Sequence, residues 1–148
     1  MHGTGRWTGF TLVELIVVVT ILCILAAFAV PHFAEFDGEA RSADATALAG
    51  ELRARAALSH AVWLAHGKPA TVTLEGRAIR MTHGYPELAT IDDTLIDFDG
   101  FVYDASGAVG RFLKTNERQE PIARCGVNYT AAPSLGAAPT IALDTSGC

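Results

Sequence analysis

The apolar run from Phe10 to Val30 constrains this chain more than any other feature, and a single acid, Glu14, interrupts it. About 20 consecutive apolar residues form a helix long enough to cross a bilayer. A carboxylate within such a helix costs roughly 2.5–3.5 kcal/mol near the bilayer centre, so an acid there is a candidate functional group. The run therefore predicts a membrane helix, and Glu14 needs an explanation.

Two explanations follow from the residue types alone. A secretory signal peptide needs a basic start and a small-x-small cleavage site. Ala27 and Ala29 supply such a site, but Arg6 is the only Lys or Arg before the run, and Glu14 interrupts its start. A plain membrane anchor would instead use Thr11 and Glu14 as a capping box, in which each satisfies a free amide at the helix start. Both explanations stay open at this level.

A third interpretation accounts for more of the sequence. A short leader, residues 1–9, precedes the junction between Gly9 and Phe10; the chain then reads TLVEL and stays apolar up to Pro31. This combination resembles the N-terminal cleavage motif of type IV prepilins and of the pseudopilins of type II secretion. The chain departs from that family at Cys23, where many relatives carry glycine, and in having a single Arg in its leader.

The resemblance implies a defined maturation. A prepilin peptidase would cut after Gly9 on the cytoplasmic side and then N-methylate Phe10. Residues 10–30 would be retained, first as an inner-membrane anchor and later as the core of a filament. Glu14 would pair with the Phe10 amine of a neighbouring subunit, since a buried acid needs a counter-charge. Pro31 would kink the helix.

Helical periodicity continues over residues 31–66, and Gly67 with Pro69 ends it. The spacing predicts one helix, about 10–66, whose second half is amphipathic. Trp63 is expected to pack the end of this helix onto a sheet. The apolar face is predicted to contain Phe33, Phe36, Ala40, Ala43 and Ala47, extended by Leu48, Leu52, Leu58 and Val62.

Residues 67–148 show the pattern of short strands separated by turns. The expected hairpin pairs are 70–74 with 77–82, 101–104 with 108–114, and 125–130 with 140–145. A helix followed by a run of strands predicts an α+β fold, with a long N-terminal helix packed on a small antiparallel sheet. The pilins that the N-terminus resembles have this architecture.

Cys125 and Cys148 lie in the last quarter of the sequence, and Cys148 is its final residue. Their placement predicts a disulfide and an oxidising compartment. Closing this loop is worth roughly 3 kcal/mol in the chain-entropy model. The alternative, two reduced cysteines in a cytosolic protein, is disfavoured by the membrane helix.

A second resemblance concerns the region after the first hairpin. The turn His83–Pro86 and the tail from Arg124 to Cys148 are similar to those of pilins of the mannose-sensitive haemagglutinin type. This similarity favours a pilin over a secretion pseudopilin.

Other chemistry finds little support. Asp97 and Asp99 are weak calcium candidates, because their spacing is not that of a helix-loop-helix calcium site. Ser59, His60 and Ser106 have no evident acid or base partners, so no enzyme and no cofactor are expected. The net charge of −5, without a basic block, argues against nucleic acid.

The expected function is a structural subunit of a type IV pilus for adhesion or motility. Its expected partners are other pilin subunits in a homo-oligomeric or mixed filament, the prepilin peptidase, the inner-membrane assembly machinery and the membrane. It would lie in the bacterial inner membrane before assembly and in an extracellular filament afterwards. The alternatives are a secretion pseudopilin, a minor pilin, or a secreted binding module released by cleavage after Ala29.

Overall fold

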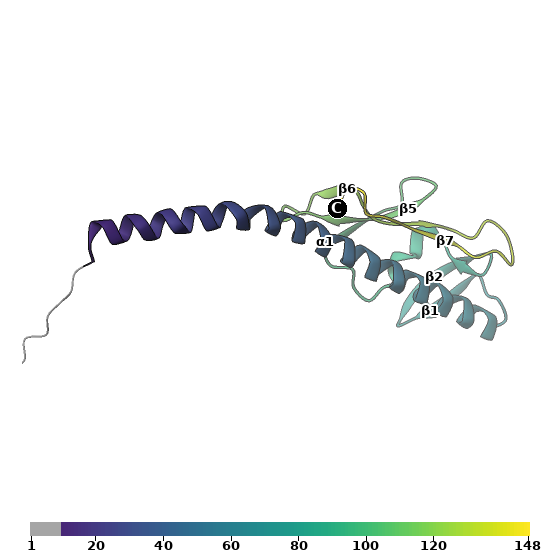
Figure 1. The fold of residues 1–148 in the computed structure, drawn as a ribbon. Coiled ribbons are helices and arrows are strands. Elements are labelled where there is room, and N and C mark those ends of the chain that lie inside the picture. The colour runs from purple at the N-terminus through teal and green to yellow at the C-terminus, as the bar shows by residue number, and fades with distance from the viewer. Residues whose placement is uncertain (1–9) are drawn as a thin grey trace, which may run out of the picture. The chain divides into compact units, whose positions relative to one another are not determined.

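The fold was analysed in a computed structural model, which describes residues 10–148, with side chains described at 10–29 and 36–148. The chain divides into two compact units, Met1–Asp37 and Gly38–Cys148, and each is described here by itself. Figure 1 shows one long helix followed by strands, which confirms the predicted α+β class.

The helix α1 runs from Leu12 to Ala65 and continues through Pro31. Its segment Leu12–Ala29 has a mean hydropathy of 2.9 and is long and apolar enough to cross a membrane, a test that signal sequences also pass. The helix ends in a Schellman motif: Gly67 has φ +76°, and the Lys68 N–H donates to the Trp63 carbonyl at 2.9 Å. The left-handed backbone at Gly67 favours glycine, at the position where the sequence predicted the end of the helix.

The first sheet is the predicted hairpin plus one short strand. The strands β1 (Thr71–Leu74), β2 (Arg77–Thr82) and β3 (Tyr85–Pro86) are antiparallel in the order β1-β2-β3. Glu75 and Gly76 connect β1 to β2, and both have positive φ, at +50° and +83°. This is the backbone that a two-residue hairpin turn requires.

The second sheet follows two 3-10 turns, η1 (Leu88–Thr90) and η2 (Asp92–Thr94). It is antiparallel, with the order β4-β5-β6-β7. Its strands are β4 (Phe101–Asp104), β5 (Gly110–Thr115), β6 (Pro121–Thr130) and β7 (Thr140–Asp144). The three predicted pairs of strands are thus confirmed, although β6 begins earlier than the sequence pattern indicated.

Two apolar clusters hold the unit Gly38–Cys148 together. The larger cluster joins α1 to the four-stranded sheet, and the smaller one joins the end of α1 to the first sheet. The larger is built on Leu48, Ala49, Leu52, Ile91, Leu95, Phe112, Val127 and Tyr129; the smaller contains Trp63, Val72, Ile79 and Met81. The predicted packing of Trp63 is confirmed.

The predicted apolar face of α1 was wrong in its first half. Phe36 is 65% exposed, and the alanines that follow it at 40, 43 and 47 are exposed as well, whereas Ala45, Leu48 and Leu52 are buried. Alanine is small enough to lie on either face, so its periodicity did not define the direction of the core; the two leucines did. Leu58 is also exposed, and the side chain of Phe33 lies outside the described ones.

Candidate functional site

The start of α1 brings together the residues that the sequence singled out. The Thr11 hydroxyl accepts the N–H of Glu14 at 3.2 Å, which caps the first turn. The Glu14 carboxylate forms no hydrogen bond or ion pair with any residue from 10 to 148, so the described structure contains one half of the capping box. Glu14 and Phe10 are exposed, the latter by 76%.

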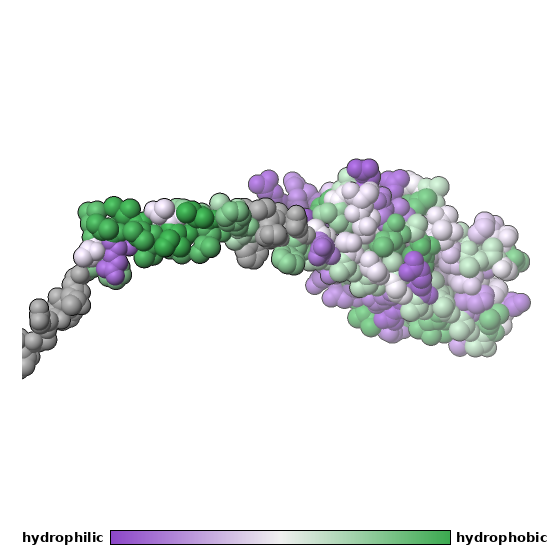
Figure 2. Space-filling model, in the orientation of Figure 1, coloured by the Kyte–Doolittle hydropathy of each residue, from purple (hydrophilic) through white to green (hydrophobic). Residues whose placement is uncertain are grey.

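An apolar surface surrounds this acid along the helix. Every described side chain from residue 10 to residue 29 is exposed, and Figure 2 shows hydrophobic residues over most of this segment. The hydroxyl of Thr20 donates to the Ile16 carbonyl at 2.8 Å, so it presents little unsatisfied polarity. Apolar patches beyond a few hundred Å² mark membrane or protein contacts, and Glu14 lies in such a patch without a partner among the described residues.

The structure describes two other predicted site residues incompletely or not at all. Gly9 lies outside the described residues. Pro31 lies within α1, but its side chain is among those not described, and the predicted kink stays a prediction.

The predicted disulfide between Cys125 and Cys148 is present, with a Cα–Cα distance of 4.7 Å. Two hydrogen bonds to backbone carbonyls support it: the Gly147 N–H donates to the Arg124 carbonyl at 2.8 Å, and the side-chain Nε of Arg41 donates to the Cys148 carbonyl at 3.0 Å. The second contact ties the segment to α1 across 107 residues, and no sequence pattern pointed to it.

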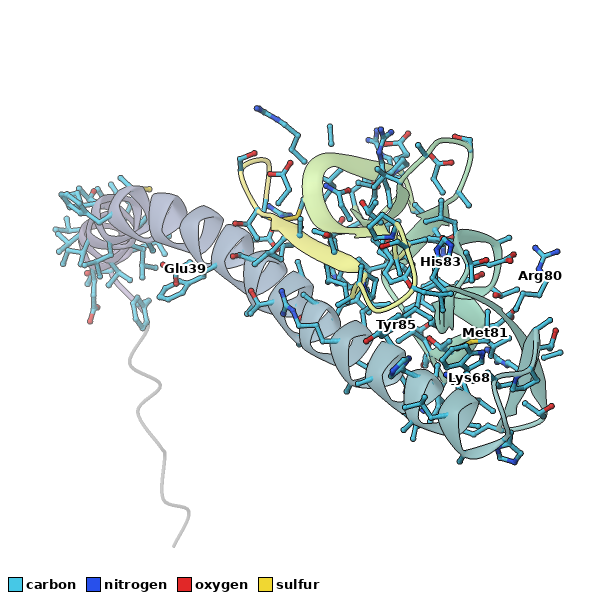
Figure 3. The ribbon with its side chains drawn as sticks, turned by 90° about the vertical axis from the view of Figure 1, so that its right-hand side faces the viewer. Glu39, Lys68, Arg80, Met81, His83 and Tyr85 are labelled. Carbon is cyan, nitrogen blue, oxygen red and sulfur yellow. A yellow bond between two sulfur atoms is a disulfide. The ribbon has the colours of Figure 1, made fainter. Side chains whose placement is uncertain are left out.

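Polar contacts also fix the segment that contains the predicted turn at residues 83–86. Nδ1 of His60 lies 2.7 Å from the Gly84 carbonyl; because a carbonyl only accepts, Nδ1 carries the hydrogen. The His60 ring stacks on Tyr85 with centroids 4.4 Å apart, and His83 Nδ1 contacts the Ala132 carbonyl at 2.8 Å. Tyr85 and His83 are labelled in Figure 3.

A buried tyrosine, Tyr129, and a half-buried one, Tyr103, form hydrogen bonds to the segment that includes Pro86 and Leu88. The Tyr129 hydroxyl donates to the Pro86 carbonyl at 2.7 Å, and the Tyr103 hydroxyl donates to the Leu88 carbonyl. Burial raises the pKa of Tyr103 to about 12 and also raises the pKa of Tyr129. Both phenols therefore stay protonated and donate over the physiological range of pH.

The loop that contains Asp97 and Asp99 has a local structural role. Asp97 Oδ1 accepts the Asp99 N–H at 3.0 Å, which closes a turn. Burial, and then the neighbouring charge of Asp93, raises the pKa of Asp92. Within the described part of the chain, no group of three or more His, Cys, Asp or Glu side chains is placed to hold a metal ion.

Comparison with known proteins finds a motif at the N-terminus and relatives that match part of the chain. Residues 8–30 match the Prokaryotic N-terminal methylation motif. The chain is 45% identical over 49 residues to a type IV major fimbrial protein FimA of Dichelobacter nodosus, covering 33% of this chain and 31% of that protein. A FimA of Dichelobacter nodosus strain VCS1703A is 36% identical over 88 residues, which cover 58% of this chain and 52% of that protein.

The chain thus spans about half or less of the curated relatives that it matches. No solved structure matches. These sequence matches agree with the geometry at residues 10–29, where the apolar side chains are exposed, the helix begins at Leu12 and Glu14 is the one acid. The chain carries the prokaryotic N-terminal methylation motif and is homologous to type IV major fimbrial proteins.

Proposed function

We propose that this chain is a structural subunit of a type IV pilus. The observation that supports this most directly is that Glu14, within a fully exposed apolar helix segment, has no partner among residues 10–148. A membrane explains the apolar surface but not the acid. A filament of parallel helices explains both, since neighbouring subunits would cover the apolar residues and offer a cation to the acid.

Processing would create that cation. In the unprocessed chain the nitrogen of Phe10 is an uncharged amide, and a cut after Gly9 turns it into an amine. We expect the prepilin peptidase to make this cut and to N-methylate Phe10. The amine of one subunit would then pair with Glu14 of the next and set the axial register of assembly.

The site of action follows from the same proposal. The subunit would first be anchored in the inner membrane by residues 10–30 and would then be polymerised by the assembly machinery into an extracellular filament. The relatives are described as major fimbrial proteins, which favours a pilus over a secretion pseudopilus. Location separates the two, because a pilus is sheared from the cell surface and a pseudopilus is not.

Mass spectrometry of sheared filaments tests the proposal. We expect a mature chain that begins at N-methylated Phe10; a chain that begins at Val30 would contradict it. Glu14→Gln should reach the membrane in normal amount and be lost from the filament fraction. Thr20→Val is a matched control, because Thr20 bonds only within its own helix. Normal filament yield from Glu14→Gln would refute the assembly role.

A further inference from the structure

A hollow of about 370 Å³ lies between the last turns of α1 and the strand β1. It is lined by Val62, His66, Pro69, Thr71, Val72 and Thr73. None of these residues is Asp, Glu, Lys or Arg. Val62 and Val72 also pack in the smaller apolar cluster around Trp63, which fixes the apolar wall of the hollow. The hollow therefore suits an uncharged apolar group.

The free edge of β1 forms one rim of this hollow. β1 is the outer strand of the first sheet and pairs only with β2. The Ala70 carbonyl accepts the Met81 N–H at 2.9 Å, and hydrogen-bonded positions alternate along an antiparallel strand. The N–H groups of Thr71 and Thr73 therefore point away from β2, and neither bonds to another described residue. An occupant with carbonyl oxygens beside an apolar side chain would satisfy both the wall and the rim.

The loop between β6 and β7 offers these groups on the surface of the same unit. Residues 131–139 read AAPSLGAAP and contain no charged side chain, on a chain whose net charge is −5. Pro133 and Pro139 have no N–H, so the carbonyls of the loop outnumber its N–H groups. Leu135 is 73% exposed, more than any other large apolar side chain of Gly38–Cys148. Its own unit thus leaves Leu135 uncovered.

A tight turn holds Leu135 in this exposed position. The Ala137 N–H donates to the Ser134 carbonyl at 3.1 Å. Gly136 has φ +85°, whereas Leu135 is not among the residues with positive φ. This is the pattern of a type II turn with Leu135 at its second position and glycine at its third. The loop is formed before any contact is made, which lowers the entropy cost of binding.

The loop and the hollow lie toward the same end of α1. The Ala132 carbonyl, near the start of the loop, lies 2.8 Å from Nδ1 of His83. The carbonyl of the next residue, Gly84, lies 2.7 Å from Nδ1 of His60, near the end of α1. Figure 1 shows the connection between β6 and β7 at that end of the unit. Copies whose α1 helices are parallel would therefore present the two surfaces at a similar level.

We propose that Leu135 of one copy inserts into this hollow on the next copy and that the contact links neighbouring subunits of the filament. The carbonyls of the loop would accept from the N–H groups of Thr71 and Thr73. The inference rests on the proposed function, because it needs subunits held side by side. Leu135 and the hollow are different surfaces, so each copy would fill one neighbour and be filled by another. Such a heterologous contact extends along a filament.

Cysteine cross-linking in sheared filaments tests this contact. In a Cys23→Ala background, Leu135→Cys combined with Thr73→Cys should give a ladder of multimers after mild oxidation, because every copy carries both positions. Either cysteine alone should give no ladder. Leu135→Cys combined with Ser106→Cys is the matched control, since Ser106 is exposed between β4 and β5 and outside the hollow. A ladder from this control, or a ladder that stops at dimers, would contradict the contact.

Truncation of Leu135 gives a second measurement. Leu135→Ser should lower the yield of sheared filaments about tenfold or more, because burying one leucine changes an association constant by roughly that factor. Ile96→Ser should give a normal yield, since Ile96 is 63% exposed in the same unit but lies outside the hollow. Filaments without the ladder, or a normal yield from Leu135→Ser, would overturn this contact alone. Absence of filaments from the unmodified chain would overturn the proposed function and this contact with it.

Discussion

Gly84 is a position where a single methyl group should be costly both for the backbone and for side-chain packing. Its φ is +89°, and a Cβ there would lie 2.8 Å from Cζ3 of Trp63 and 3.0 Å from Nδ1 of His60. The left-handed backbone costs an alanine roughly 1–2 kcal/mol, and overpacking a well-filled site costs typically 1–3 kcal/mol more. Gly84→Ala should therefore lower the free energy of unfolding by about 2–5 kcal/mol.

Gly136→Ala separates the two costs. Gly136 has a similar φ of +85°, but a Cβ there would meet no atom within 4 Å. This variant should lose only the stability that the left-handed backbone costs an alanine. The free energies of unfolding of the two variants should therefore differ by about 1–3 kcal/mol. Denaturant unfolding followed by Trp63 fluorescence, in a Trp7→Phe background and in micelles, measures both. Equal losses would show that the contacts of Gly84 with Trp63 and His60 do not limit this site.

Other contacts lead to further predictions. Tyr129→Phe leaves the Pro86 carbonyl without its donor and should cost about 1–3 kcal/mol in chemical denaturation, since Tyr129 is fully buried. Cys125→Ser or Cys148→Ser should cost roughly 3 kcal/mol by the chain-entropy model, and reductant should destabilise only the unmodified chain. The raised pKa of Asp92 means that the folded state binds its proton more tightly, so Asp92→Asn should stabilise the chain at neutral pH. That gain should shrink as the pH falls through the folded pKa, as thermal melts at several pH values will show.

The parts of the fold that depend on residues adjacent in the sequence were predictable from the sequence. Glu75-Gly76 between two alternating segments indicated the first hairpin, and Gly67 followed by Pro69 indicated the end of α1. The face of α1 was not predictable in the same way, because the alanines at 40, 43 and 47 tolerate either side. The sheet that selects Leu48 and Leu52 begins only at Phe101, far later in the chain.

The contacts that join the first sheet to the second sheet and to α1 were missed for the same reason. Tyr129 and Pro86 are 43 residues apart, and His60 and Gly84 are 24 apart. Neither pair has a spacing that a sequence pattern can reveal. The family resemblance marked the Gly-Tyr-Pro turn, but only the structure places His60 and Tyr129 upon it. The one available clue was the hydroxyl of Tyr129, because a buried tyrosine hydroxyl usually has a hydrogen-bond partner.

The fold of a single chain does not account for the acid at Glu14. The helix start is already capped by Thr11, so the fold does not need the Glu14 carboxylate, although an acid in this segment is costly. Thr11→Ala should then loosen the first turn by about 1 kcal/mol and leave the proposed assembly contact of Glu14 intact. Glu14→Gln should leave the turn intact and remove that contact. If Thr11→Ala abolishes filaments while Glu14→Gln spares them, assembly depends on the capped first turn and not on the charge of Glu14.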